Sequence, residues 1–462
     1  MSQSPPSQNS WSKPPPASPA DAASPAPAPP KRPLASAKAG KEFRLVGGIF
    51  AAVFVATLAI YIAALMTTPR IVAPVRVPPP TQNGFPLLKA ATDKPVHKDD
   101  VGDAISVSPK KKWTLAGKRK LVDANRSAIL ATRKALTIPY REENRAVSIN
   151  DEFPYYAKFR HMARVLVLAG NVVWEEGKQR EAADYYLDAL TIGRRVPHRA
   201  GLISRLVGIA CESISRRAIW DRLARMDAPT TAHCLTRLQA LQAERLPYSV
   251  TLEEEKYTMQ HVAMEGMKNP DVFLSAGEDE TPAGGDQTAR RVFRAYRTVV
   301  PRKYVADTLG SHMDKLIAQS RKPYIEGNAE LPVPKELYTS IMMPTVRQAR
   351  LKYVHGEAGD ALLRTALALR LYKARNGKYP SDLSELVAAK LLPAVPDDPF
   401  DLPGASLHYA SSPMGKYVLY SIGPDGTDDG GKGIEVKSGT RKPNRTVALD
   451  SQGDMVAGWH GY

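Results

Sequence analysis

Cysteine is almost missing from this chain, which has only Cys211 and Cys234 among its 462 residues. So few cysteines exclude the dense disulfide framework of a small secreted domain. The two residues lie in amphipathic helical sequence about 23 positions apart, where buried free thiols are the commoner outcome. A disulfide between them remains the alternative, because the pair could oxidise outside the cytoplasm.

The sequence also lacks the short motifs that mark common enzyme classes. It contains no G-x-S-x-G, no P-loop and no G-x-G-x-x-G between a strand and a helix. Glu254, His261 and Glu265 fall on one helical face and are the one candidate cluster for an enzyme's metal. HExxH and related motifs are absent, so charged residues on a solvated helix face explain these three side chains better.

The basic residues are not gathered in one dominant block, although the formal net charge is +17. Lysine and arginine are spread over helical sequence that also carries many acidic residues. This distribution argues against nucleic acid as a partner. We expect the counter-charge to be an anionic envelope polymer or lipid head groups.

One long uncharged apolar run, LVGGIFAAVFVATLAIYIAALM, occupies residues 45–66. A helix of that length crosses a hydrocarbon core of roughly 30 Å. The run begins too far from the N-terminus, and is too long, for the apolar core of a cleaved signal peptide, which favours an uncleaved anchor. Basic residues before the run outnumber Arg70 and Arg76 after it, which predicts a cytoplasmic N-terminus and an extracytoplasmic body at the inner membrane. The residues before it are Lys31, Arg32, Lys38, Lys41 and Arg44.

The run divides the chain into segments of different composition. Residues 1–43 are mainly Ser, Pro and Ala and should form a disordered cytoplasmic tail, followed by a transmembrane helix at 44–67. Residues 68–111 are again rich in proline, and PVRVPPP favours polyproline II. We expect this linker to be a spacer that holds the folded part off the bilayer.

Residues 112–345 show apolar residues at three- and four-residue spacing, which predicts a helical domain. The acidic Gly/Pro segment at 268–287 is the expected hinge, and Pro344 is expected to kink the last long helix. The predicted helices span residues 113–137, 156–177, 179–194, 199–225, 230–244, 249–267, 288–299, 302–320 and 334–376.

Small residues at Gly170, Ala182 and Ala189, with an aromatic residue at Tyr186, follow the spacing of a two-helix repeat. With them, residues 160–194 resemble one tetratricopeptide unit. The small residues should let the two antiparallel helices approach while Tyr186 fills the seam. The same pattern does not recur 34 residues earlier or later in the chain. Neighbouring helices of different sequence must therefore cover the apolar face of this hairpin. A helical array and an irregular helical domain are both compatible with this pattern.

After residue 376 short strand-like runs alternate with Gly, Pro and Asp. The motifs NGKYP, DPF and YVLYSIGPDG, in this order, resemble the soluble end of the major pseudopilin of type II secretion systems. The resemblance covers about 80 residues and implies, for residues 346–462, a small α+β module in which a long helix packs on an antiparallel sheet. The matching positions are Leu371, Tyr372, Lys373, Asn376, Gly377, Lys378, Tyr379, Pro380, Asp398, Pro399, Phe400, Tyr417, Tyr420, Ser421, Gly423, Asp425 and Gly426.

The chain departs from the pseudopilin pattern near its N-terminus. In that family the membrane helix runs directly into the soluble helix, whereas here about 300 residues intervene. The residues after Gly40 also lack the glutamate expected five positions into a mature pilin. We therefore do not expect processing or assembly as a pilin, and the layout is similar to bacterial membrane-anchored proteins of unassigned function.

The resemblance also implies a calcium site, because pseudopilins of this type bind calcium in the loop that holds Asp425, Asp428 and Asp429. Carboxylates and backbone carbonyls of such a loop suit an ion that takes roughly six to eight oxygens. Asp450 and Glu435 are weak candidates for a closing ligand. The alternative is a hairpin loop in which Asp-Gly supplies only turn geometry.

Taken from the sequence, the chain is mainly α and anchored by a single transmembrane helix. Its helical, tetratricopeptide-like domain and its pseudopilin-like end predict an interaction or scaffold protein with protein partners, associated with secretion or envelope assembly. The alternative is an enzyme that acts on envelope material and uses the long helical domain as its catalytic body. A cleft lined by converging carboxylates would favour the enzyme.

Overall fold

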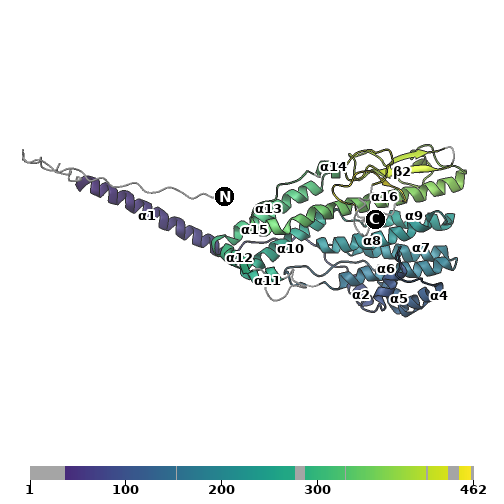
Figure 1. Cartoon of the computed structure of the whole chain (residues 1–462), viewed down its shortest axis with the longest axis horizontal. Coiled ribbons are helices and arrows are strands. Elements are labelled where there is room, and N and C mark those ends of the chain that lie inside the picture. Colours follow the sequence, from purple (N-terminus) through teal and green to yellow (C-terminus); the bar gives the residue numbers. More distant parts are fainter. Residues whose placement is uncertain are drawn as a thin grey trace, which may run out of the picture. The chain divides into compact units, whose positions relative to one another are not determined.

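The computed structural model describes residues 37–151, 153–275, 287–327, 329–412, 415–434 and 447–458. The chain divides into two compact units, residues 1–61 and residues 62–462. The described residues are mainly helical, and three short strands form one small antiparallel sheet (Figure 1). Residues 1–36, most of the predicted tail, lie outside the described residues.

The first helix, α1 (Ala37–Met66), takes in seven residues that composition had placed in the tail. Its segment Arg44–Met66 is long and apolar enough to cross a membrane, and none of its apolar window is buried. Phe50 and Ile60, for example, are 73% and 71% exposed. The predicted long apolar helix is therefore present.

Most of the second unit consists of helices. Several of them closely match the predicted ranges, and residues 270–275 of the predicted hinge are helical. The helices before the last long one are α2 (Gly84–Ala91), α3 (Lys98–Ala104), α4 (Leu115–Ala124), α5 (Arg126–Leu136), α6 (Tyr155–Glu175), α7 (Gln179–Arg195), α8 (Leu202–Leu223), α9 (Ala228–Ala243), α10 (Tyr248–Lys268), α11 (Pro270–Ser275), α12 (Gln287–Val299), α13 (Arg302–Ser320), α14 (Tyr324–Gly327) and α15 (Leu337–Met342).

The pair α6 and α7 forms the expected close hairpin. Gly177 separates the helices with a positive φ of 84°, a conformation that suits glycine. A Cβ placed on Gly170 would lie 2.4 Å from Cε1 of Tyr186, so only glycine leaves room for that ring. Tyr186, Ala182 and Ala189 are fully buried. The Tyr186 hydroxyl donates to Oδ1 of Asn171 at 3.0 Å.

The prediction that residues 68–111 form an extended spacer is wrong for the second half of that range. Asn83 caps α2 by accepting from the Phe85 amide, and α2 packs against α5. Phe85 and Leu88 are 3% and 1% exposed, and Val101 of α3 is fully buried. Burial of these apolar side chains outweighs the local preference of the proline-rich sequence for an extended chain.

Two other predicted helices are broken. Residues 113–137 form α4 and α5, which meet at Asn125, whose side-chain amide donates to the Leu121 carbonyl at 2.8 Å. Pro344 does not kink a continuous helix but is the first residue of α16 (Pro344–Asn376). Proline suits a first helical position because its missing N–H would have no helical partner there.

Helix α16 joins the helical region to the C-terminal sheet. It packs against α8 and α9 and also contacts β2 (Figure 1). It ends at Gly377 with a φ of 73°, as its sequence predicts, and α17 (Ser384–Ala388) follows. The domain boundary predicted between residues 345 and 346 therefore falls in the first turn of α16. Residues on both sides of that boundary belong to one hydrophobic core.

The sheet has the order β1 (His408–Ser411), β2 (Tyr417–Ser421), β3 (Met455–Val456) and is antiparallel throughout. Tyr409 pairs with Leu419, and Ser421 pairs with Met455. One of the strand-like runs after residue 376, TVAL at residues 446–449, forms no strand in its described part, and Met455–Val456 is the third strand instead. Cys211 and Cys234 are both buried and free, which confirms the commoner expectation over the disulfide.

Candidate functional site

The predicted calcium loop follows β2 directly, and its carboxylates already bind protein groups. Asp425 accepts from the amides of Gly453 at 3.0 Å and Thr427 at 3.2 Å. Asp428 accepts from the Tyr420 hydroxyl at 2.9 Å, and its second oxygen lies 3.3 Å from Nδ1 of His408. These contacts connect the loop to β1, to β2 and to the residues before β3.

A fourth acid, Asp454, closes this loop and was missed by the sequence analysis. Its carboxylate accepts from the amides of Asp429 at 3.3 Å and Gly431 at 2.7 Å. Asp454 is fully buried, and burial raises its pKa, with Asp428 and Asp429 adding to the rise. In the sequence, the one indication of this role is that Asp454 is a single acid between Gly453 and the apolar strand β3. The weak candidate Glu435 lies outside the described residues, and Asp450 lies in a turn.

The loop therefore combines turn geometry with nearby carboxylates. Gly423 and Gly426 have φ of 74° and 69°, which supports the hairpin interpretation. Among the described residues, no three His, Cys, Asp or Glu side chains gather closely enough to hold a metal ion. Calcium binding by Asp425, Asp428 and Asp429 stays a prediction.

Calcium at millimolar concentration should raise the melting temperature of the full-length protein, because an ion held only by the folded loop stabilises the fold. The whole chain is needed, since α16 packs on α8 and α9 as well as on the sheet. Asp425→Ala should remove the increase, and Asp401→Ala, in a turn outside the loop, should keep it. Calorimetry with calcium and with chelator measures both; an unchanged melting temperature would leave only the hairpin interpretation.

The second predicted cluster, on α10, has structural roles. Glu254 is 3% exposed and receives two bonds from Arg76, at 2.8 and 2.9 Å, and two from Arg145, at 3.0 and 3.1 Å. Glu265 accepts from the Ser148 hydroxyl at 2.8 Å, and His261 contacts the carbonyl of Tyr257. The expectation of a solvated face is wrong for Glu254, because that carboxylate fastens two distant segments to α10.

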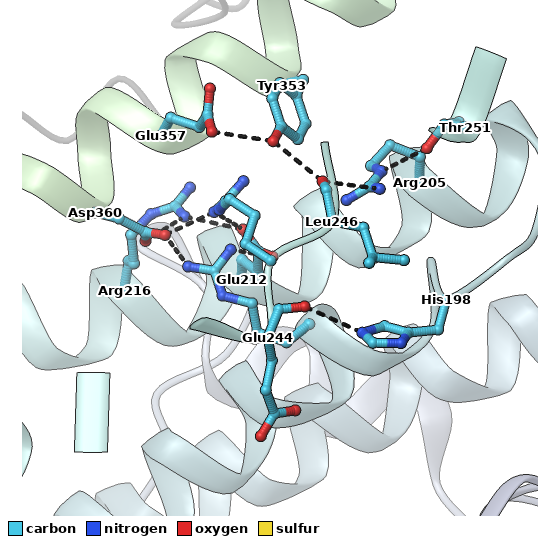
Figure 2. Close-up of polar contacts among 12 residues, drawn as sticks. His198, Arg205, Glu212, Arg216, Glu244, Leu246, Thr251, Tyr353, Glu357 and Asp360 are labelled. Atoms are coloured by element: carbon cyan, nitrogen blue, oxygen red, sulfur yellow. Dashed lines mark hydrogen bonds and ion pairs between the residues drawn. The ribbon is translucent and has the colours of Figure 1, made fainter. Parts of the chain in front are cut away.

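A larger polar centre, which the sequence analysis missed, lies between α7, α8, α9 and α16 (Figure 2). Glu212 of α8 accepts from Arg194 at 2.8 Å and from Arg245 at 2.9 Å. Asp360 of α16 accepts from Arg216 at 2.9 Å and from Arg245 at 2.6 Å, and it also pairs with Arg194. All five side chains are at most 3% exposed.

The electrostatics of this ionic centre keep its groups charged. Burial alone would raise the pKa of Glu212, but Arg194, Arg245 and Arg216 bring it down to about 2. Burial lowers the pKa of Arg194 to about 9, and Arg245 adds to the fall. Burial also opposes the charge on Arg245, yet Glu212 and Glu357 raise its pKa above the ordinary value. In a dry interior such ion pairs keep their geometry only while every partner is present.

A second group of side chains, from α8, α10, α16 and the turn before α10, borders the centre (Figure 2). The Tyr353 hydroxyl lies 3.1 Å from the Leu246 carbonyl and 3.0 Å from Oε1 of Glu357. Arg205, which is 3% exposed, donates to the Thr251 hydroxyl at 2.9 Å and to the Leu246 carbonyl at 3.3 Å. This guanidinium therefore binds neutral oxygens.

A cavity of about 510 Å³ adjoins these residues. It lies between the start of α10, the turn after α13 and the first half of α16, and Arg245, Tyr353 and Glu357 are part of its lining. A cavity of this size holds a small organic molecule. Of the residues described in the ionic centre, Arg245 is the one that reaches the cavity.

No family model matches this chain, and no curated protein or solved structure is significantly similar to it. Its site is therefore defined by its own geometry. The sequence did contain one indication of the ionic centre, because Asp360 stands alone in the apolar run of α16 and Glu212 precedes Arg216 by one helical turn. The other ion pairs join residues up to 166 positions apart, so no local sequence pattern indicates them.

Proposed function

We propose that this chain is a single-pass membrane protein whose residues 62–462 form an extracytoplasmic binding body, with a pseudopilin-like end, at a secretion or envelope assembly. The observation that carries the proposal is the bare apolar surface of α1. Its apolar window is wholly unburied, and side chains such as Phe50 and Ile60 have no described protein partner that covers them. In water so large an apolar surface is unfavourable, whereas a bilayer covers it.

The ionic centre supports a binding or scaffold role over the enzyme alternative. Glu212 and Asp360 each accept hydrogen bonds from several arginines. Neither carboxylate is therefore available to act on a molecule in the cavity. Glu357 is the one carboxylate in the described lining of that cavity, whereas glycoside hydrolysis typically uses two carboxylates that flank the bond to be cleaved. Packing of α16 on β2 supports the pseudopilin-like arrangement of the end.

Reporter fusions test the proposed topology. A cytoplasm-dependent reporter such as a fluorescent protein should be active when fused after residue 20, and a periplasm-dependent phosphatase should be active after residue 150. The physical reason is the excess of basic residues on the N-terminal side of α1. Deleting residues 45–66 is the matched control, because it should release the protein from membranes and silence the phosphatase.

Two outcomes would contradict this topology. An active phosphatase after residue 20 would reverse the orientation. A protein that carbonate at high pH extracts from membranes as completely as the deletion variant would show that α1 does not span the bilayer.

A further inference from the structure

Buried positive charge exceeds buried negative charge around the ionic centre. Five guanidinium groups are at most 9% exposed there, whereas the paired carboxylates are those of Glu212 and Asp360. The guanidinium groups belong to Arg194, Arg205, Arg216, Arg245 and Arg350. Buried charges in proteins are normally paired, so this excess calls for an anion.

Glu357 is the carboxylate that lies beside this excess, in the described lining of the cavity. Burial raises its pKa above the ordinary value, although Arg245 opposes the rise. The Tyr353 hydroxyl has one proton and lies within hydrogen-bond distance of two acceptors, Leu246 O and Glu357 Oε1. Either the hydroxyl shares its proton between both acceptors, or Glu357 is protonated and donates to the hydroxyl oxygen. The raised pKa means that Glu357 gives up its proton less readily than an exposed glutamate does.

Arg350 is the second buried cation that reaches the cavity. Its guanidinium donates to the carbonyls of Lys322 at 2.9 Å and Pro323 at 3.3 Å, and also to that of Gly327. No carboxylate among the described residues pairs with it. These bonds hold the turn after α13 in place and keep a positive charge at the cavity wall.

The cavity brings these cations together. Arg245 and Arg350 line it from the interior, and the exposed Lys322 lines it at the solvent side. Nε of Arg245 is buried and has no hydrogen-bond partner. By contrast, each guanidinium group that lines a separate cavity of about 570 Å³ has a carboxylate partner. Arg133 pairs with Asp188, Arg237 pairs with Asp184 and Asp188, and Arg195 pairs with Glu244. Arg350, which pairs with no carboxylate among the described residues, thus distinguishes the smaller of these two cavities.

We propose that the cavity between α10, α13 and α16 is a binding site for a small organic molecule that carries a carboxylate or phosphate group. The anionic group lies between Arg245, Arg350 and Lys322 and supplies the missing negative charge. Tyr248 and Tyr353, whose rings stack with centroids 5.4 Å apart, form part of the cavity wall beside this group. This inference does not depend on the topology proposed for α1.

Titration calorimetry of the full-length protein in detergent tests the site with inorganic phosphate and glucuronate as probes and glucose as the uncharged control. We expect saturable binding of phosphate, glucuronate or both, and none of glucose. Lys322→Glu should raise the Kd at least about tenfold, since it turns an attraction of the anion into a repulsion. Lys322→Gln should have a smaller effect in the same direction.

The matched control is Lys303→Glu, the same charge reversal at the far end of α13, where the side chain is exposed and pairs with Asp307. It should leave the Kd unchanged, which separates a local contact from a general change in net charge. Binding of neither anion by the parent protein would overturn the proposal. Equal affinities for the parent and the Lys322→Glu variant would overturn it as well, because the anion would then bind elsewhere.

Discussion

Replacing Asp360 with asparagine is expected to lower the free energy of unfolding by about 3–5 kcal/mol, the range for breaking a buried ion pair on one side. The asparagine keeps the size of the side chain but removes the charge that Arg194, Arg216 and Arg245 share. Three guanidinium groups would then face Glu212 as their remaining ionic partner. Urea unfolding of the full-length protein in detergent, followed by circular dichroism, measures the change.

Asp314→Asn is the matched control for this experiment. Its carboxylate is 61% exposed and pairs with Lys256 at 2.7 Å. An exposed pair contributes little, so this variant should stay within about 0.5 kcal/mol of the parent. If Asp360→Asn unfolds like Asp314→Asn, the ionic centre is open to water in solution, and the charge balance drawn from its burial is wrong.

A second large loss of stability is expected from Tyr186→Asp. The ring is fully buried against Gly170, and an aspartate there would leave both a cavity and an unpaired charge between α6 and α7. We expect a loss of about 3–5 kcal/mol, as for other uncompensated buried charges. The same urea experiment provides the measurement.

Two further variants separate the causes. Tyr186→Phe removes only the hydrogen bond to Asn171 and should cost about 1 kcal/mol. Tyr304→Asp, at a position that is 56% exposed on α13, should stay within about 0.5 kcal/mol. A Tyr186→Asp protein as stable as Tyr304→Asp would show that the α6–α7 seam is not closed around this ring.

Local sequence predicted helices well where apolar periodicity and a stop residue coincide. Gly177 between α6 and α7 and Gly377 after α16 are such residues, and both have positive φ. Prediction failed where tertiary contacts override local preference. The proline-rich flanks of α2 suggest an extended chain, but Phe85 meets Tyr140 and Tyr155 at ring distances of 5.6 Å, and those contacts come from residues more than 50 positions away.

The candidate sites were harder to predict than the helices, because they depend more on contacts between residues far apart in the sequence. The aspartate loop after β2 was predictable because its acids are neighbours in the sequence, whereas Asp454 joins it from beyond residue 450. The ionic centre needed Arg194, Glu212 and Asp360 together, and no local pattern relates residues on three separate helices. Charged residues of an amphipathic helix look alike in sequence, whether water or another helix surrounds them.

If α1 spans a bilayer as proposed, the short connection after it limits how far residues 62–462 can act from that bilayer. Ile71 packs against the core of the second unit, and Arg76 is fastened to Glu254, so only four residues separate Met66 from the first packed side chain. Fully extended, the stretch from Met66 to Ile71 covers at most about 18 Å. On the proposed topology the protein is a short tether rather than a long arm. It would recruit molecules that already lie close to the membrane surface and would not reach across the envelope to collect them.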